Sequence, residues 1–428
     1  MSLAFAGLFL LLIIGTPLGM AFALAVMGRA GSFNLDLDAL GAIPYETISA
    51  VPLVAIPLFL LVGEIMNRGG LALCLSQICD RILHFLPARM GHIAVAASGL
   101  MSAMTGSSVA TVAAIGATVG PEMTARGYKR AYSASLVAAA GLLGVLLPPS
   151  IPLILYGSVV GTSIVDLFLA TLVPGLIMAG AFFATHALRS RSVLRGGVES
   201  AVAPAGAAGL DRAPAPPPGA TVSALLLPVF VLGGIYSGLT TPTEAAAIAA
   251  AAALAMTLIQ RTLRWDQVPV VFTNAVKASA AILTIIALTS LFNRALVLNQ
   301  VPQDIAAFAL SVTDDPIVFL IGVNLLLLLV GMFMETNAAV MLMGPLLAPA
   351  AIKFGIDPVH FGIILVTNIE IGLITPPLAA NVFVAARTLD VNMVKMLPHL
   401  AWFFGAALSV LLLISFVPEL TLWFRHFQ

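Results

Sequence analysis

Charged residues are scarce in this chain of 428 residues. Aspartate, glutamate, lysine and arginine make up 9% of it against 60% hydrophobic residues, and 19 basic and 19 acidic residues cancel to a net charge of zero. So apolar a composition excludes an ordinary soluble protein, and the lack of a basic excess excludes a nucleic-acid-binding surface. The sequence therefore predicts a multi-pass protein of the lipid bilayer.

Cysteine and histidine are scarce too. Two cysteines, Cys74 and Cys79, and six scattered histidines form no cluster with the spacing of a metal site, so we expect two buried thiols without a metal or redox role. His84, His92 and His186 fall near the ends of predicted helices, where we expect them at the membrane interface.

Long apolar runs dominate the chain instead. Leu3 to Met27 and Met393 to Val417 both exceed the roughly 20 residues that cross a hydrocarbon core. The first run shows no small-residue cleavage pattern, so we interpret it as a retained helix rather than a signal peptide. Leu71 to Leu86 is shorter and more polar, which is typical of a helix lying at the interface. The predicted fold class is all-α.

Two apolar runs are interrupted in the middle by small and polar residues. Residues 91–121 are broken at Thr105-Gly106-Ser107-Ser108, and residues 316–349 at Glu335-Thr336-Asn337. Each arm of the first run has about 14 residues and spans roughly 21 Å, too short to cross the membrane. We predict two re-entrant helical hairpins, although one continuous span with closely packed small residues is a rival reading of the first run.

Two further runs are broken by consecutive prolines. Residues 128–161 are interrupted at Leu147-Pro148-Pro149-Ser150, and residues 358–387 at Thr375-Pro376-Pro377. A pair of prolines removes two backbone donors and frees the carbonyls upstream. Non-helical backbone is tolerated at membrane depth only where protein or a water-filled cavity satisfies it, so these broken helices mark a site.

The interrupted runs belong to an internal repeat. Adding 228 to a residue number in the first half leads to an identical residue, mostly Gly or Pro, at these positions: Val112 and Val340, Gly116 and Gly344, Pro121 and Pro349, Gly127 and Gly355, Gly144 and Gly372, Pro148 and Pro376, Pro149 and Pro377. We therefore predict a first repeat over 1–188, a cytoplasmic linker over 189–221 and a second repeat over 222–428.

Charge sets the orientation of the two copies. The base of the first hairpin carries Arg89, Arg126, Lys129 and Arg130, whereas the base of the second carries acidic residues against a single lysine: Asp314, Asp315 and Asp357 against Lys353. By the positive-inside rule the two bases lie on opposite faces of the membrane, so the repeats are inverted.

Such an arrangement predicts a site for small ions and an anion near the midplane. Freed carbonyls and hydroxyls favour small hard cations, which suggests Thr105, Ser107, Gly144 and Leu147 for one site. Thr336, Gly372 and Thr375 supply the symmetric second site.

Amino ends of half-helices favour anions, so we expect an anionic substrate between the hairpin tips. The residues expected to contact it are Ser107, Ser108, Ser150, Glu335, Thr336, Asn337, Asn381 and Arg387. Ser107 and Ser108 have the alternative role of packing helices, and Arg387 that of extending to the interface. Glu335 is a candidate because intramembrane carboxylates are usually functional.

Several long motifs occur in the order of a known family. They are IPLFLLVGEIMNRGGL at 56–71, SGLMSAMTGSSVATVAAIG at 98–116, GLLGVLLPPSIPLILYG at 141–157, TPTEAAAIA at 241–249 and IGLITPPLAANVFVA at 371–385. Over essentially its whole length the chain resembles the large membrane subunit of TRAP transporters, the tripartite ATP-independent periplasmic family. One departure is Leu142, where many relatives carry a threonine.

The resemblance implies an elevator-type fold of the ion-transporter superfamily and a Na⁺-driven importer of an organic acid (a C4-dicarboxylate, keto acid or sugar acid) in the bacterial inner membrane, not an enzyme. A periplasmic binding protein would deliver the substrate, and a separately encoded small four-helix membrane subunit would complete the permease. The Na⁺ ligands that it implies are Ser102, Thr105, Ser107, Gly144 and Pro148 in the first site, and Thr336, Gly372, Thr375 and Pro376 in the second.

Two other functions stand as rivals. A single-chain Na⁺/dicarboxylate symporter of related fold would share the architecture but need no partner. An intramembrane hydrolase would use Ser107 or Ser108 as its nucleophile, but the sequence offers no histidine or lysine at a matching depth.

Overall fold

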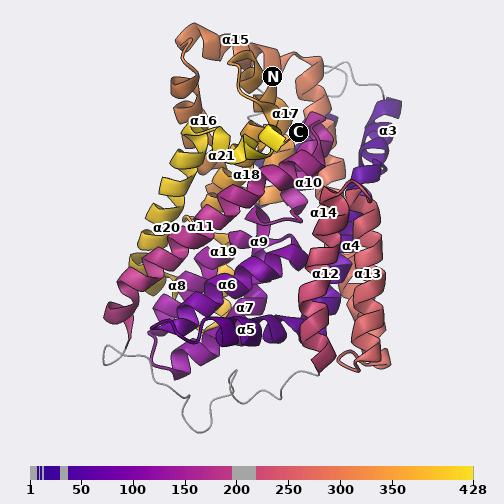
Figure 1. Ribbon diagram of the computed structural model, residues 1–428. Coiled ribbons are helices and arrows are strands. Elements are labelled where there is room, and N and C mark those ends of the chain that lie inside the picture. Colours follow the sequence, from indigo (N-terminus) through magenta and orange to yellow (C-terminus); the bar gives the residue numbers. More distant parts are fainter. Residues whose placement is uncertain (1–6, 9, 12–13, 29–36, 195–217, 428) are drawn as a thin grey trace.

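The structure is a computed structural model that describes residues 7–8, 10–11, 14–28, 37–194 and 218–427. Helices make up nearly all of these ranges, and the isolated bridge between Tyr128 and Leu194 is the only β-pairing within them (Figure 1). Six helical segments of the described chain are long and apolar enough to cross a membrane. They are Val51–Arg68, Ile164–Val193, Pro242–Ile259, Trp265–Leu298, Pro316–Phe333 and Met393–Phe416. The all-α multi-pass class is therefore confirmed.

The first half of the chain contains ten described α-helices and one 3₁₀ turn. They are α2 (Leu18–Met27), α3 (Leu37–Ile48), η2 (Val51–Val54), α4 (Ala55–Arg68), α5 (Leu71–Ile82), α6 (Arg89–Thr105), α7 (Ser108–Ala125), α8 (Arg130–Ala140), α9 (Leu143–Leu146), α10 (Ile151–Val160) and α11 (Ile164–Val193). The predicted continuous span from Leu3 to Met27 is wrong in its described part. A turn at Gly15, whose φ is +87°, and the following Pro17 separate α2 from the residues before it. The rest of that run lies outside the described residues.

The second half follows after residues 195–217, which lie outside the description. It contains α12 (Pro218–Tyr236), α13 (Pro242–Ile259), η3 (Trp265–Gln267), α14 (Val268–Leu298), α15 (Val301–Val312), α16 (Pro316–Phe333), α17 (Thr336–Lys353), α18 (Pro358–Gly372), α19 (Ala380–Thr388), α20 (Met393–Phe416), α21 (Glu419–Leu422) and η4 (Trp423–Phe427). Helices extend into both ends of the predicted linker over 189–221, because α11 continues to Val193 and α12 begins at Pro218.

The helices of the two halves match at the predicted offset. Adding 228 to the bounds of α7 gives the bounds of α17, and the same shift leads from α6 to α16, from α8 to α18, from α10 to α19 and from α11 to α20 within a few residues. Figure 1 places α5 along the lower end of the molecule and α15, its counterpart, along the upper end. The two copies therefore have inverted orientations.

Both predicted hairpins are interrupted close to the expected residues. In the first, Gly106 adopts φ +58° and ends α6, and Ser107 begins α7 as an extended N-cap. Since α6 and α7 pack along each other, the hairpin is preferred to the rival single span. In the second, Met334 and Glu335 separate α16 from α17, and α16 packs mainly on α18 while α17 packs on α10, α14, α15 and α18.

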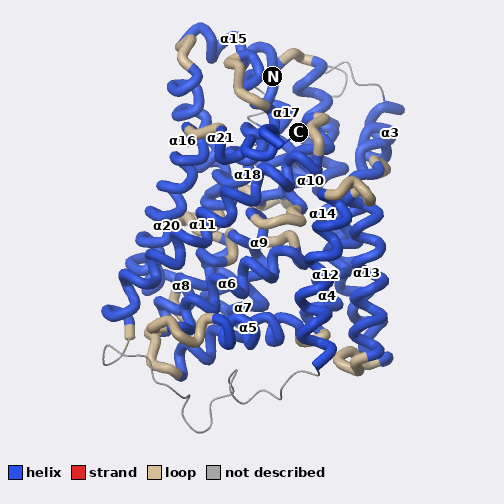
Figure 2. The backbone as a smooth tube through the Cα atoms, in the orientation of Figure 1, coloured by secondary structure: helices blue, strands red, loops and turns tan. Residues whose placement is uncertain are grey.

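The two broken helices also form as predicted. Residues 147–150 separate α9 from α10, and residues 373–379 separate α18 from α19; the Pro148-Pro149 and Pro376-Pro377 bonds are both cis. The first broken helix contains one further interruption, at Gly141-Leu142, that the sequence did not predict. Figure 2 shows loop segments beside α9 in the middle of the molecule, with helices above and below.

The helices form two groups that meet beside the hairpin tips. We call α4, α12, α13 and α14 the lateral helices, and α6–α11 and α16–α20 the central helices. Figure 1 shows α4, α12 and α13 side by side at the right of the molecule, where α13 packs on both α4 and α12. The groups touch where α14 packs on α17 and α4 packs on α6.

Two histidines near the lower end of the central helices are buried inside the protein. His92 and His186 are 5% and 0% exposed, while their depth at the membrane interface stays a prediction. The Tyr132 hydroxyl lies 2.7 Å from Nδ1 of His186, and the other ring nitrogen lies 2.9 Å from the Ala88 carbonyl oxygen. These contacts fix the imidazole in the core. His84 is exposed, and its ring contacts the Arg81 carbonyl.

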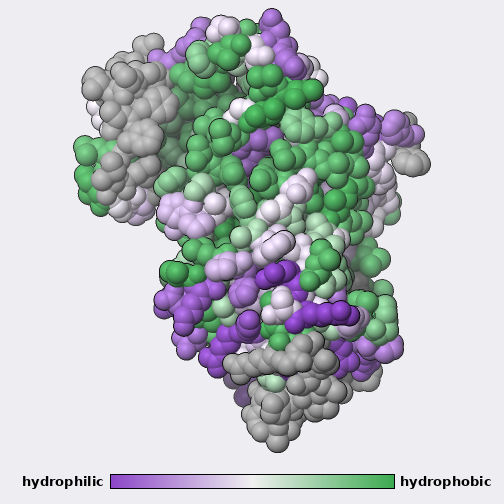
Figure 3. Space-filling view, turned by 90° about the vertical axis from the view of Figure 1, so that its left-hand side faces the viewer, coloured by the Kyte–Doolittle hydropathy of each residue, from purple (hydrophilic) through white to green (hydrophobic). Residues whose placement is uncertain are grey.

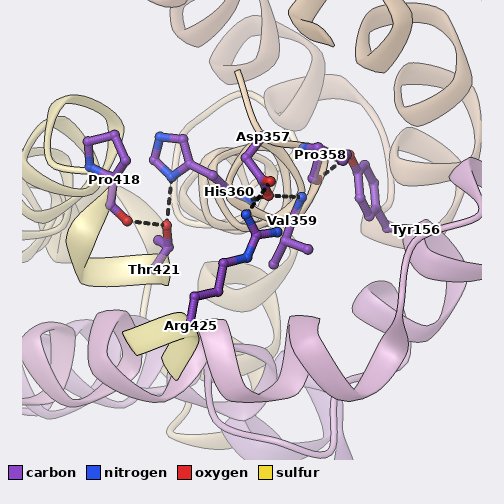
Figure 4. Close-up of polar contacts among 8 residues, drawn as sticks. All are labelled: Tyr156, Asp357, Pro358, Val359, His360, Pro418, Thr421 and Arg425. Atoms are coloured by element: carbon purple, nitrogen blue, oxygen red, sulfur yellow. Dashed lines mark hydrogen bonds and ion pairs between the residues drawn. The ribbon is translucent and has the colours of Figure 1, made fainter. Parts of the chain in front are cut away.

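The upper end of the central helices is tied together around the start of α18. The Tyr156 hydroxyl of α10 donates to the Pro358 carbonyl at 2.8 Å, which joins the two repeats. From the other side, Arg425 of η4 pairs with Asp357 at 2.7 Å (Figure 4). The C-terminal segment thus closes over the central helices.

The surface fits a membrane protein. On the face in Figure 3, hydrophobic side chains cover much of the upper and middle parts, and hydrophilic side chains gather toward the lower end. The exposed Lys129 and Arg130 are the N-cap and the first residue of α8, at the cytoplasmic end expected from the charge pattern. Its assignment to the cytoplasm remains a prediction from the charge pattern.

Candidate functional site

The tips of both hairpins line one small cavity of about 50 Å³. Its lining residues come from hairpin tips, broken helices and α14: Gly106, Ser107, Ser108, Val109, Val145, Ile151, Pro152, Ile282, Glu335, Thr336, Asn337, Glu370, Leu373 and Ala380. Five of the residues predicted to bind substrate therefore converge: Ser107, Ser108, Glu335, Thr336 and Asn337. Neither histidine nor lysine, the partners that a serine nucleophile was expected to need, occurs in this lining.

A cluster of hydroxyl and carbonyl oxygens lies behind the first tip. Ser102 donates a short hydrogen bond to the Leu147 carbonyl, which joins α6 to the first break. The hydroxyls of Thr105 and Thr111 lie 3.0 Å apart, and Thr111 also donates to the Ser107 carbonyl at 2.9 Å. The predicted ligands Thr105 and Ser107 are thus joined through Thr111, which the sequence reading missed, whereas Ser102 is bonded to the break itself.

Gly144 lets the tip approach the broken helix. A Cβ atom at this position would lie 2.6 Å from the Thr111 hydroxyl oxygen and 2.8 Å from the Ser107 carbonyl oxygen. Gly144 therefore joins the predicted first cluster, at contact distance from two of its oxygens. Pro148 is buried in the adjacent break but makes no hydrogen bond that would assign it a ligand role.

The second cluster is built around a carboxylate. Thr336 donates to Oε1 of Glu370 at 2.9 Å, and Glu370 is fully buried on α18. The Thr375 hydroxyl donates to the Ile371 carbonyl at 2.8 Å at the end of α18. Gly372 packs directly on the backbone of Gly331 in α16, where a Cβ would overlap it. Thr336, Gly372 and Thr375 therefore lie at one junction, with the exposed Pro376 after it.

Glu335 and Asn337 shape the second tip. The Glu335 carboxylate accepts from the backbone N–H groups of Asn337 and Ala338 at 3.0 and 3.2 Å, and from the Asn337 amide at 2.6 Å. Glu335 therefore caps α17, much as Ser107 caps α7 at the equivalent position. The same carboxylate oxygens that cap α17 would have to contact the substrate, so capping is an alternative role for Glu335.

Three predicted substrate residues lie outside the cavity lining. Ser150 and Asn381 are fully buried next to lining residues, and their side-chain polar atoms have no hydrogen-bond partner. Arg387 is exposed at the last turn of α19, away from the tips. The structure brings Ser150 and Asn381 near the site but does not bring Arg387 there.

Glu370 is the main residue that the sequence reading missed. It lies inside the apolar run of α18, two residues before Gly372. Glu370 is itself not at a helix break, and the search for breaks at Gly and Pro therefore did not find it. Two signals were present. It is a carboxylate in a membrane segment, and subtracting 228 leads to Leu142, the residue already noted as a departure from the family pattern.

Inverted repeats whose hairpin tips and helix breaks meet at one polar cavity define the class of ion-transporter-like membrane proteins. The sequence matches the family described as "Tripartite ATP-independent periplasmic transporter, DctM component" over residues 5–420. The chain belongs to this family, as the large permease component, and the expectation that it is not an enzyme is confirmed by that membership.

Two relatives of similar length are large permease proteins of named TRAP transporters. The chain is 36% identical to the C4-dicarboxylate TRAP transporter large permease protein DctM of Pseudomonas aeruginosa, covering 88% of this chain and 87% of that one. It is 32% identical to the sialic acid TRAP transporter large permease protein SiaM of Vibrio cholerae, covering 96% and 95%.

The chain spans 65% of a longer relative, the isethionate TRAP transporter permease protein DctMQ of Oleidesulfovibrio alaskensis, at 35% identity over 97% of this chain. The fold is also similar to the Alcanivorax borkumensis YdaH transporter, with a TM-score of 0.61, 15% identity and coverage of 92% and 90%. This last likeness concerns the fold alone.

Proposed function

We propose that the protein is the permease of a Na⁺-coupled TRAP transporter that imports a small organic acid across the bacterial inner membrane. The observation that carries the proposal is the convergence of both hairpin tips on one cavity, flanked by two clusters of oxygen atoms. Inverted repeats of this kind place substrate and coupling ions at the repeat interface.

The chemistry of the first cluster supports a small hard cation. Its groups are the hydroxyls of Ser102, Thr105 and Thr111 and the carbonyls of Ser107 and Leu147. Oxygen ligands of this type suit hard cations, and the lack of a formal charge suits a monovalent ion that must leave again after transport. Na⁺ bound there would connect the first tip to the first broken helix.

The substrate class is proposed from the relatives. Their names give isethionate, C4-dicarboxylates and sialic acid, which are all organic anions. We infer an organic acid for this protein as well, delivered by a periplasmic binding protein and moved together with a small four-helix membrane subunit. The choice among a C4-dicarboxylate, a keto acid and a sugar acid follows from the binding protein in this proposal.

Movement would occur between the two groups of helices. The central helices hold both tips and both breaks, whereas the lateral helices contribute Ile282 of α14 to the cavity wall. Sliding of the central helices against α4 and α14 would expose the cavity first to one side of the membrane and then to the other, which is an elevator-type mechanism.

Uptake by proteoliposomes tests the proposal. The permease is reconstituted with its small subunit and a binding protein, and labelled organic acids are offered under an inward Na⁺ gradient. We expect accumulation that needs both the gradient and the binding protein. Uptake that persists when K⁺ replaces Na⁺ would refute the coupling, and uptake without any partner protein would favour a single-chain symporter.

A further inference from the structure

Basic side chains gather where α8, α11 and α20 meet. Lys129 is the N-cap of α8, Arg189 lies near the end of α11, and His399 lies in the first part of α20. Helix α20 packs on both α8 and α11 at the left of the molecule (Figure 1). Lys129 and Arg189 both act electrostatically on the His399 ring, so the three side chains lie close together.

No carboxylate pairs with this basic cluster in the part of the chain that the structure describes. The salt bridges there involve other cations, namely Arg68, Arg89, Arg126, Arg264 and Arg425. Nε of Arg189 and Nδ1 of His399 are also enclosed without a hydrogen-bond partner. Enclosed cationic groups are costly unless they are paired, so the cluster lacks an anion.

The geometry of Arg189 suits a phosphate group. Its guanidinium carbon lies 4.8 Å from the centroid of the Trp402 ring. Stacking on the ring engages the flat face of the guanidinium, and the N–H groups at its edge remain to donate to an oxyanion. The planar fork of arginine matches two oxygens of one phosphate, and Lys129 adds a second positive charge.

Apolar side chains next to the cluster along α11 and α20 are exposed. Trp402 is 55% exposed, Leu188 is 84% exposed and Leu397 is 38% exposed. Tryptophan is enriched where membrane helices meet the headgroup region, because its ring is amphipathic. A free phosphate would gain nothing from these apolar surfaces, whereas acyl chains would pack on them. The surroundings therefore favour a phosphate that belongs to a lipid.

We propose that Lys129, Arg189 and Trp402 bind the headgroup phosphate of an anionic phospholipid, whose acyl chains lie along the exposed side of α20. Basic pockets between membrane helices bind headgroups of this kind. The lipid would fill the space between α8, α11 and α20 at the membrane surface and supply the missing counterion. Neither the coupling ion nor the transported acid takes part, so the site goes beyond the proposed function.

Native mass spectrometry of the purified full-length protein in detergent, titrated with phosphatidylglycerol, tests the inference. We expect Arg189→Gln to raise the Kd of the tightest bound lipid about fivefold, as the loss of one charge beside an anionic headgroup predicts, and Lys129→Gln to raise it by about the same factor. Arg261→Gln is the matched control. Arg261 is an exposed arginine that follows α13 at the right of the molecule, and its variant should match the wild type.

Two further ligands identify what is recognised. Phosphatidylcholine, whose headgroup has no net charge, is expected to bind at least fivefold more weakly than phosphatidylglycerol, and millimolar inorganic phosphate is expected not to displace the lipid. Equal binding of both lipids would overturn recognition of an anionic headgroup. Displacement by inorganic phosphate would show a general oxyanion site instead of a lipid site.

The variants decide whether the cluster is the site. Unchanged phosphatidylglycerol binding by Arg189→Gln would refute the proposal, and so would an equal loss in Arg261→Gln, which would indicate diffuse attraction to any surface charge. If Arg189→Gln does not fold, as judged by its elution profile, Lys129→Gln decides by the same comparison, because the Lys129 side chain is exposed and holds no helix in place.

Discussion

At the scale of single residues, Thr111 connects the groups of the first cluster. It shares a hydrogen bond with Thr105 and donates to the Ser107 carbonyl, and it is fully buried. Replacing Thr111 by valine removes the hydroxyl oxygen and leaves the shape of the side chain nearly unchanged. This makes Thr111 the most direct probe of the first cation site.

We expect Thr111→Val to raise the Na⁺ concentration for half-maximal uptake about tenfold, or about 1.4 kcal/mol, because one polar ligand is lost. Thr118→Val is the matched control, since Thr118 lies on the same helix and its hydroxyl donates only to backbone carbonyls of its own turn. Equal Na⁺ dependence in both variants would remove Thr111 from the site.

The two native cysteines should be inert. Both are buried and free on α5, which is not among the membrane-spanning helices of the described chain, and burial raises the pKa of the Cys79 thiol to about 12. Only the thiolate is nucleophilic, so at pH 8 about one thiol in ten thousand would be reactive. We expect maleimide to label Cys79 only after denaturation, as mass spectrometry would show. Fast labelling of the folded protein would contradict the buried position.

Residue chemistry was only partly predictable from the sequence. Ser107, Ser108 and Thr336 were found because they lie at breaks in apolar runs. Glu370 and Thr111 lie inside helices, and their role depends on which neighbouring helix packs against them. That information is tertiary, and a helical pattern does not contain it.

At the scale of helices, close packing at glycine positions determines how near the hairpins and the broken helices approach each other at the site. Hairpin α6–α7 reaches the first broken helix only because Gly144 lacks a side chain. The repeat offset and the breaks could be predicted because Gly and Pro act through the backbone. The extra interruption at Gly141-Leu142 could not, since no proline marks it.

We expect Gly144→Ala to weaken transport strongly while the protein still folds. The added methyl group would meet the Thr111 hydroxyl and the Ser107 carbonyl, and such overpacking typically costs about 1–3 kcal/mol. Gly180→Ala on α11 is the matched control, because nothing lies within 4 Å of the added atom. Thermal unfolding and uptake are measured for both. Normal uptake by Gly144→Ala would show that the tip does not need this contact.

At the scale of the whole molecule, the lateral and central helices must move past each other if the proposed mechanism is right. A cavity of about 140 Å³ lies between α4, α14 and the first hairpin, and both Ala110 of α7 and Ala278 of α14 line it. Glu64 of α4 lines it as well, and it accepts from Asn274 of α14 at 2.8 Å, which ties the lateral helices together.

We expect a cysteine pair, Ala110→Cys with Ala278→Cys, to stop uptake when a thiol-bridging mercury reagent is added and to recover with a reducing thiol. The bridge would fix the first hairpin to α14, so the central helices cannot slide. Ala110→Cys alone is the control. Undiminished uptake by the bridged protein, with bridging verified by mass spectrometry, would exclude sliding at this contact.

The match between α7 and α17 at an offset of 228 residues has one more consequence. When two inverted copies share a sequence pattern, each copy can adopt the conformation of the other. If the two copies exchanged conformations, the molecule would open to the opposite side of the membrane. Here the first hairpin is folded tightly along itself and the second is splayed toward its neighbours. During transport the two repeats would then exchange these conformations, and the molecule would pass through an intermediate in which both repeats have the same conformation.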